Sequence, residues 1–100
     1  MAYFQTDGNV RRIQPEDLQD GVVLREVHTS EPTTPPFGDA VISHQTERLV
    51  TLRRPHMTFM DGQWIADVES VDVSPERLCR VDSPYRVVLT SRGLPYRMAR

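Results

Sequence analysis

The chain has 100 residues, of which 38% are hydrophobic and 26% charged, and its formal net charge is −2 at pH 7. This composition is typical of one globular domain and excludes a disordered or membrane-spanning chain, because no apolar run approaches the roughly 18 residues that a membrane helix needs. Cys79 is the single cysteine, so no intrachain disulfide can form. The N-terminal residues lack the basic and apolar regions of a secretory signal. We therefore expect one domain, residues 1–100, in the reducing environment of the cytoplasm.

The charged residues have two unusual features. All 12 basic residues are arginines, which indicates a GC-rich genome and favours a bacterial, phage or mobile-element origin. Residues 1–47 contain three arginines and eight acidic residues, whereas residues 48–100 contain nine arginines and six acidic residues. This asymmetry indicates either an anion-binding end or two halves that neutralise each other after folding.

The first third of the chain predicts a turn, a strand and a loop. Residues 14–21 predict a turn or a single helical turn, because Pro15 fixes φ and Asp20-Gly21 is a turn pair. Residues 22–27 contain three valines and one leucine, which predicts a strand. Residues 28–38 contain three prolines. Proline cannot donate a hydrogen bond to a sheet, so this segment is expected to be a loop.

The next segments predict a hairpin. Residues 39–43 and 48–53 have the composition of two strands joined by a short turn, with Val50 and Leu52 on one face of the second strand. Pro55 is expected to end this strand, because a proline inside a sheet removes a ladder hydrogen bond.

A second hairpin is predicted around Asp61-Gly62, a dipeptide that favours a two-residue hairpin turn. A short extended piece precedes this turn, and residues 64–73 form the longest candidate strand. The apolar residues of this strand change phase, because Trp64 and Val68 share one face whereas Val71 and Val73 share the other. A β-bulge or sharp bend at residues 69–70 would bring both groups to the same side.

The last quarter of the chain predicts one helical turn and one strand. Ser74 can cap a helix, and Pro75 suits the first helical position, which predicts a short helical turn near residues 75–80. Residues 85–90 predict a strand with its odd-numbered residues directed inward. Residues 94–100 are expected to form a tail or a short edge strand.

These elements predict a mainly β fold, a small barrel or roll of five to six short strands with one short helical turn near residues 75–80. Closing a small sheet into a barrel removes its unpaired edges. A turn followed by a strand at residues 15–27 also occurs at the start of SH3-like barrels. This opening covers about a tenth of the chain and does not by itself identify a family, so the expectation remains a small barrel, of which SH3-like barrels are one example, or a roll.

No group of residues predicts catalysis, and we expect no enzyme activity and no cofactor. The three histidines have no metal-ligand spacing, so no metal site is expected. Asp67 and Glu69 share one face of a predicted strand and could act as an acid–base pair, but neighbouring arginines could equally neutralise them. Cys79 is interpreted as a small buried apolar residue, since the end of a helical turn does not lower the pKa of a thiol.

Candidate partner-binding residues fall into two groups. Pro36 and Phe37 end a proline-rich segment, and a stiff segment that ends in an aromatic ring is a common anchor for protein contacts. A second group combines arginines with a histidine, and it comprises Arg53, Arg54, His56, Arg86 and Arg92. Arginine forks can hold phosphates or carboxylates. Trp64 could be a further anchor or part of the core.

Two functions follow from these patterns. The first is a non-enzymatic binding or assembly module that acts through protein–protein contacts, with a protein partner or with further copies of itself. The alternative is a small nucleic-acid-binding β-barrel with an arginine-rich face, although nucleic-acid-binding domains are usually basic and this chain has a pI near 5.9. No membrane contact is expected.

Overall fold

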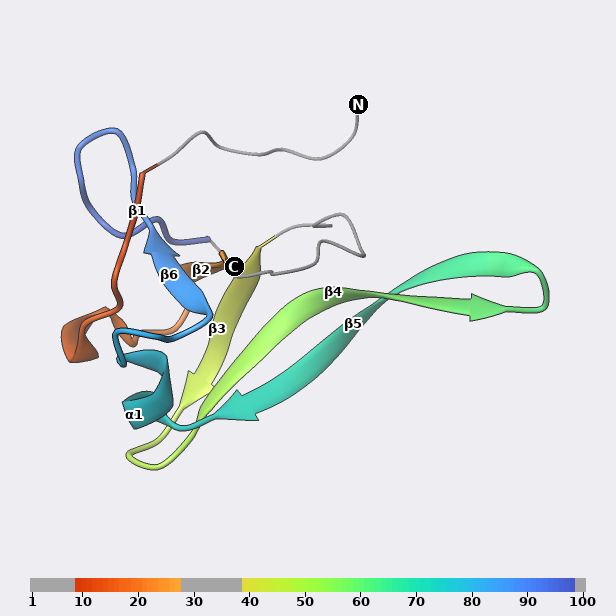
Figure 1. Ribbon diagram of the computed structural model, residues 1–100, viewed down its shortest axis with the longest axis horizontal. Helices are drawn as coiled ribbons and strands as arrows, with labels where there is room; N and C mark the ends of the chain where they lie inside the picture. The colour runs from red at the N-terminus through yellow and green to blue at the C-terminus, as the bar shows by residue number, and fades with distance from the viewer. Residues whose placement is uncertain (1–8, 28–38, 99–100) are drawn as a thin grey trace.

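The computed structural model describes residues 9–27 and 39–98 of the chain. Six antiparallel strands form one sheet in the order β1-β6-β2-β3-β4-β5. The strands are β1 (Val10–Arg11), β2 (Val23–Glu26), β3 (Ala40–Gln45), β4 (Val50–Met60), β5 (Gln63–Val73) and β6 (Tyr85–Val88). A 3₁₀ turn, η1 (Pro15–Asp17), precedes β2, and a short helix, α1 (Pro75–Leu78), connects β5 to β6 (Figure 1).

The predicted mainly β fold, the number of strands and the helical turn after residue 74 are confirmed, but the predicted closure into a barrel is wrong. The sheet is open, because β1 and β5 lie at opposite ends of the strand order and do not pair with each other. The lengths of these strands explain the open edge. β1 has two residues and β5 has 11, so β1 offers few backbone groups to pair with β5. The prediction of uniformly short strands is also wrong for β4 and β5.

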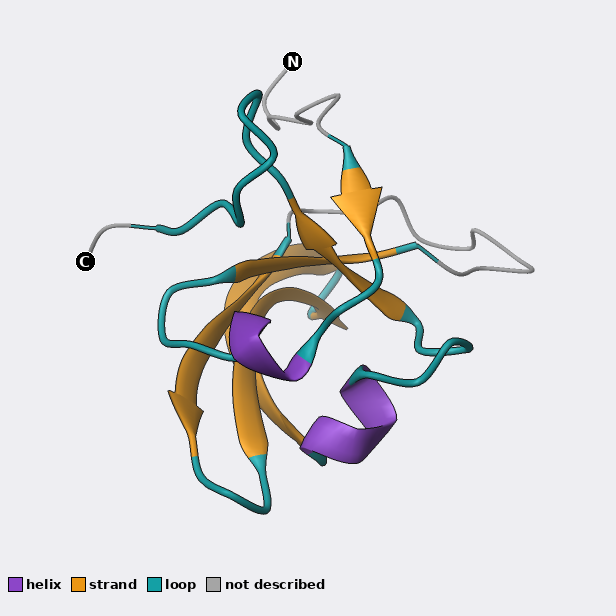
Figure 2. Cartoon of the chain, turned by 90° about the vertical axis from the view of Figure 1, so that its left-hand side faces the viewer, coloured by secondary structure: helices purple, strands orange, loops and turns teal. Residues whose placement is uncertain are grey.

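The hydrophobic core lies on the concave side of this curved sheet, where η1 and α1 cover it (Figure 2). Alternate residues of each strand point to this side, as the period of two in a strand requires. The odd-numbered inward pattern predicted for the last strand is confirmed, since Tyr85 and Val87 are buried and Leu89 packs against the core. The buried cluster comprises Ile13, Val22, Leu24, Ala40, Ile42, Val50, Leu52, Leu78, Tyr85 and Val87.

The predicted cap of the helical turn is confirmed. The Ser74 hydroxyl accepts a hydrogen bond from the backbone N–H of Arg77 at 3.2 Å, and Pro75 occupies the first helical position. The helix is only four residues long, so its own hydrogen bonds stabilise it little. It is held mainly by Leu78, which is fully buried in the core.

The prediction that Pro55 ends a strand is wrong, because β4 continues through Pro55 to Met60. Two features of the pairing explain this. β3 pairs with β4 only as far as Arg53, so a missing N–H on that side removes no hydrogen bond. On the side of β5, hydrogen-bonded pairs alternate with non-hydrogen-bonded pairs, starting from the hydrogen-bonded pair of Met60 with Gln63 beside the turn. The pair of Pro55 with Val68 is therefore non-hydrogen-bonded, and the missing N–H removes no bond to β5.

The predicted bulge at residues 69–70 is also wrong. The register between β4 and β5 is unbroken from Val50 opposite Val73 to Met60 opposite Gln63. The irregularity lies instead in the β3–β4 pairing, between Ile42 and His44. The phase change that the sequence shows in β5 is therefore a real change of the apolar side of the ribbon.

The turn between β4 and β5 supports a local stability prediction. Asp61 and Gly62 have φ values of 52° and 77°, the left-handed conformations of a two-residue hairpin turn. Replacing Gly62 by alanine places a side chain in this conformation, which should destabilise the hairpin by about 1 kcal/mol. Hydrogen exchange should show faster exchange of the backbone amides that pair near the turn, with unchanged exchange in β2 and β6. Asp61→Asn is the matched control, since asparagine also tolerates this conformation, and equal exchange in both variants would contradict the prediction.

Candidate functional site

The outer half of the β4–β5 hairpin projects from the body of the protein (Figure 1). Beyond Arg53, β4 pairs only with β5, because the β3–β4 pairing ends there. We call residues 54–69 the arm. Its strands run about 20 Å beyond the sheet, given a rise of about 3.3 Å per residue.

One side of the arm is entirely apolar. Residues directly opposite each other on antiparallel strands place their side chains on the same side. Three such pairs follow one another along the arm on the side that faces away from the core. These pairs are Pro55 with Val68, Met57 with Ala66, and Phe59 with Trp64, and we call them the apolar face.

Three side chains of the apolar face are largely exposed to solvent, whereas Met57 is half-buried. Trp64 is 66% exposed, Phe59 is 58% exposed and Val68 is 53% exposed. The rings of Phe59 and Trp64 contact each other edge to face, with centroids 5.2 Å apart and an interplanar angle of 65°. The lone tryptophan is thus a surface residue in this fold. It extends the apolar face almost to the turn.

The apolar face lies opposite the side on which the body buries its core. Val50 and Leu52 are fully buried and belong to the even-numbered side of β4, whereas the apolar residues of the arm in β4 are odd-numbered. Sequence reasoning missed this surface, because it interpreted the change of phase as a bulge that would bring both groups into the core. The signal was present in the alternation of residues 64–73.

On the other side of the arm, an ion pair joins its two strands and a hydrogen bond joins it to β6 of the body. Arg54 donates from Nε to Glu69 at 2.6 Å and from Nη1 to the Tyr85 hydroxyl at 2.9 Å. The hydrogen bond to Glu69 raises the pKa of the Arg54 guanidinium, although partial burial opposes this effect. His56 Nε2 lies 3.8 Å from Glu69. Glu69 is therefore paired with the cross-strand Arg54. This is the second of the two arrangements that the sequence allowed for Asp67 and Glu69.

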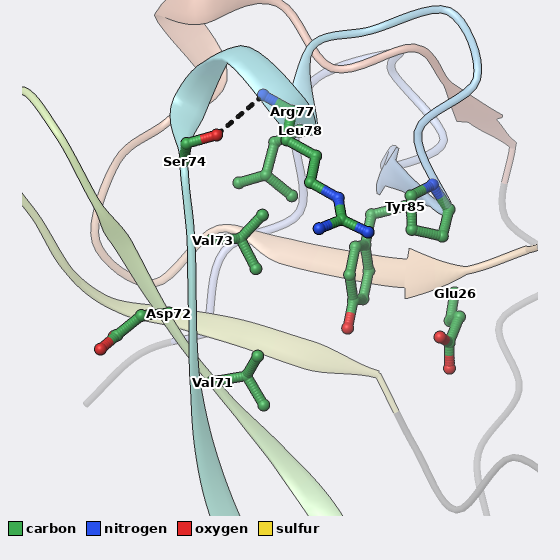
Figure 3. A pocket seen from close by; sticks show the side chains of 9 residues that line it. Glu26, Val71, Asp72, Val73, Ser74, Arg77, Leu78 and Tyr85 are labelled. Carbon is green, nitrogen blue, oxygen red and sulfur yellow. Dashed lines mark hydrogen bonds between the residues drawn. The ribbon is translucent and has the colours of Figure 1, made fainter.

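A pocket of about 340 Å³ lies where β5 meets α1 (Figure 3). Arg77 extends over it beside Tyr85, and Glu26 lies at one end, while Asp72 points away to the other side of the strand. Burial raises the pKa of the Tyr85 hydroxyl, so this group is protonated at neutral pH. The pocket therefore presents one cation, one carboxylate and a neutral phenol around an apolar floor.

The predicted partner-binding residues do not share one environment. Arg53 is exposed where the arm leaves the body, next to Arg54 and its ion pair. Arg86, in β6, donates to the backbone carbonyls of Val81, Ser83 and Tyr85. The remaining predicted residues are His56 in the arm, Arg92 in the turn after β6, and Pro36 and Phe37, which lie outside the described residues.

Cys79 and the possible metal ligands are the remaining reactive side chains in the described part of the chain. Burial raises the pKa of the Cys79 thiol, so little of the nucleophilic thiolate is present at neutral pH. No group of three or more histidine, cysteine or carboxylate side chains among residues 9–27 and 39–98 could hold a metal ion. Within the same residues, no helix has the length and hydrophobicity required to cross a membrane.

Comparison with known proteins gives no family. No family model matches the chain, and no curated protein or solved structure is significantly similar to it. What the chain binds must therefore be inferred from the shape and chemistry of its own surface. The arm is its most distinctive feature, because it combines an exposed apolar face with a position outside the body of the fold.

Proposed function

We propose that this protein is a non-enzymatic binding or assembly module that contacts a protein partner through the apolar face of its arm. The observation that carries this proposal is the uninterrupted row of three apolar pairs on the side of the arm opposite the core. A two-stranded hairpin alone is only marginally stable in water. Covering the apolar face with a partner would both remove it from water and hold the arm in one conformation.

The residues of the apolar face suit protein recognition. Aromatic side chains dominate the binding energy of many protein interfaces. Burying apolar surface contributes about 25 cal/mol per Å², so a face of about 20 Å by 10 Å contributes about 5 kcal/mol before the entropic cost of association is subtracted. Trp64 and Phe59 would supply most of this area.

A membrane surface fits the arm less well than a protein does. Asp61 lies at the end of the arm and would have to enter the bilayer first. The nearest arginines, Arg53 and Arg54, lie at the base of the arm, whereas membrane-binding segments place basic residues beside their apolar side chains. The apolar residues also extend along one side of the ribbon, as expected for a contact with another protein layer.

Affinity capture from a lysate of the source organism tests the proposal. The wild-type protein, a Phe59→Ser/Trp64→Ser variant and a Met60→Ser/Ile65→Ser variant serve as baits. The last variant is the matched control, because it removes exposed apolar side chains from the other side of the same strands. We expect the wild type and the control to retain the same proteins, further copies of the chain included, and the Phe59/Trp64 variant to lose them.

Three results would contradict the proposal. The first is the same set of captured proteins with all three baits. The second is sedimentation with phosphatidylcholine–phosphatidylglycerol vesicles that requires Phe59 and Trp64. The third is fluorescence anisotropy showing binding to labelled DNA at low salt that falls steeply as salt rises, since this dependence is characteristic of phosphate contacts.

A further inference from the structure

We infer that the partner of the apolar face is a second copy of this chain, stacked face to face with the arms antiparallel; this inference rests on the proposed function. Two β layers pack about 10 Å apart when their apolar sides interdigitate. The two-fold axis would lie between the two arms and cross the strand direction at the level of Met57 and Ala66. Each copy then presents the same surface to the other, as a two-fold interface requires.

The sizes of the side chains are complementary in this arrangement. The apolar face carries its largest residues, Phe59 and Trp64, near the turn and its small or compact residues, Pro55 and Val68, at the base. An antiparallel stack places the large pair of one copy over the compact pair of the other. A parallel stack would place the large pairs on each other at one end and leave the other end loosely packed.

The charges at the two ends of the apolar face are also complementary. Arg53 precedes Met57 by four residues in β4, and Asp61 follows it by four residues. A two-fold axis at Met57 therefore brings Arg53 of one copy to the level of Asp61 of the other, and the reverse contact forms at the opposite end. Arg53 points to the same side of the sheet as the apolar face, and the described residues give its side chain no hydrogen bond or ion pair.

The area of the apolar face limits the strength of the dimer. A stable interface buries about 800 Å² per partner. The apolar face measures about 20 Å by 10 Å, so it covers only part of that area. We therefore expect a reversible dimer that forms at micromolar or higher concentrations.

Sedimentation velocity of the full-length protein over a concentration series tests the contact. We expect the wild type to dimerise, with a blue shift of Trp64 fluorescence as the dimer forms. Phe59→Ser and Trp64→Ser should each raise the dissociation constant at least tenfold, whereas Met60→Ser and Ile65→Ser should change it less than twofold. Equal thermal unfolding midpoints show that the variants remain folded, which is expected because these side chains are exposed.

Charge removal tests the antiparallel orientation. Arg53→Gln and Asp61→Asn should each weaken the dimer about two- to threefold, and the double variant should be no weaker than either single variant, because both remove the same ion pairs. Arg48→Gln is the control, since Arg48 is exposed in the β3–β4 turn away from the arm. In a parallel stack like charges would meet, so a tighter dimer after either single change would overturn the orientation.

The proposed function and this inference fail separately. A strict monomer at every concentration overturns the inference, as does a dimer that Phe59→Ser and Trp64→Ser leave unchanged. If the same apolar-face variants still lose proteins captured from the lysate, the proposed function stands with a different partner.

Discussion

Replacing Leu78 by alanine should lower the free energy of unfolding by about 3 kcal/mol. Leu78 is the fully buried side chain of α1 and packs into the core on the concave side of the sheet. Its truncation would leave a cavity between the helix and the strands, and a four-residue helix has few other contacts to close it. Chemical denaturation followed by tryptophan fluorescence and circular dichroism would measure the change.

The control for this prediction is Val81→Ala. Val81 follows α1 closely but is 71% exposed, so its truncation should change stability by less than about 0.5 kcal/mol. A Leu78 variant as stable as the Val81 variant would contradict the role of α1 as the cover of the core.

Replacing Arg11 by methionine should cost about 2 kcal/mol at neutral pH. Asp17 is 4% exposed, and Arg11 donates to both of its carboxylate oxygens at 2.6 and 2.9 Å. Removing one partner of a buried ion pair leaves the other charge unpaired, which costs about 3–5 kcal/mol when both are fully buried. The value expected here is smaller because the Arg11 side chain is 38% exposed and solvent screens part of the interaction.

The pKa of Asp17 determines how the stability loss in Arg11→Met depends on pH. Burial alone raises the pKa of Asp17, but hydrogen bonds from Arg11 and from the Gln14 backbone outweigh it, so its pKa lies below the ordinary value in the folded protein. A lowered folded pKa contributes stability above the pKa of the unfolded chain and loses it as pH falls through the folded pKa. The difference between wild type and Arg11→Met should therefore be largest at neutral pH and shrink in acid.

Denaturation curves at several pH values check this expectation. Arg12→Met is the matched control, because Arg12 is exposed and its Nε donates to the backbone carbonyl of Cys79. It should cost about 0.5 kcal/mol or less, with little dependence on pH. A stability loss in Arg11→Met that is the same in acid as at neutral pH would contradict the ion-pair explanation.

Local patterns in the sequence predicted most of the body of the fold. The Asp61-Gly62 turn, the Ser74 cap and the inward side of β6 depend on residues close in sequence, so composition and alternation were sufficient. The closed barrel was not a local property. It depended on whether the two outer strands could meet, and β1 is too short for the pairing that closure would need.

The sequence did not predict the arm, because two general rules for β-sheets do not apply to it. Sequence reasoning expected a proline to end β4, but Pro55 lies where β3 no longer pairs. It also expected all apolar residues of β5 to face one core. The arm departs from that expectation because Trp64 and Val68 lie outside the body, where the apolar side is free to change.

The exposed backbone edges of β4 and β5 in the arm determine whether further strands can pair with it. Any exposed ribbon risks growing into an aggregate by adding strands to its open margins. At the level where Pro55 faces Val68, β4 has no N–H to offer, and the carboxylate of Asp67 accepts the N–H of Val68 at 2.6 Å. Neither edge of the arm therefore has a free N–H donor at this level, so the outer ribbon should resist the addition of further strands despite its exposed aromatic rings.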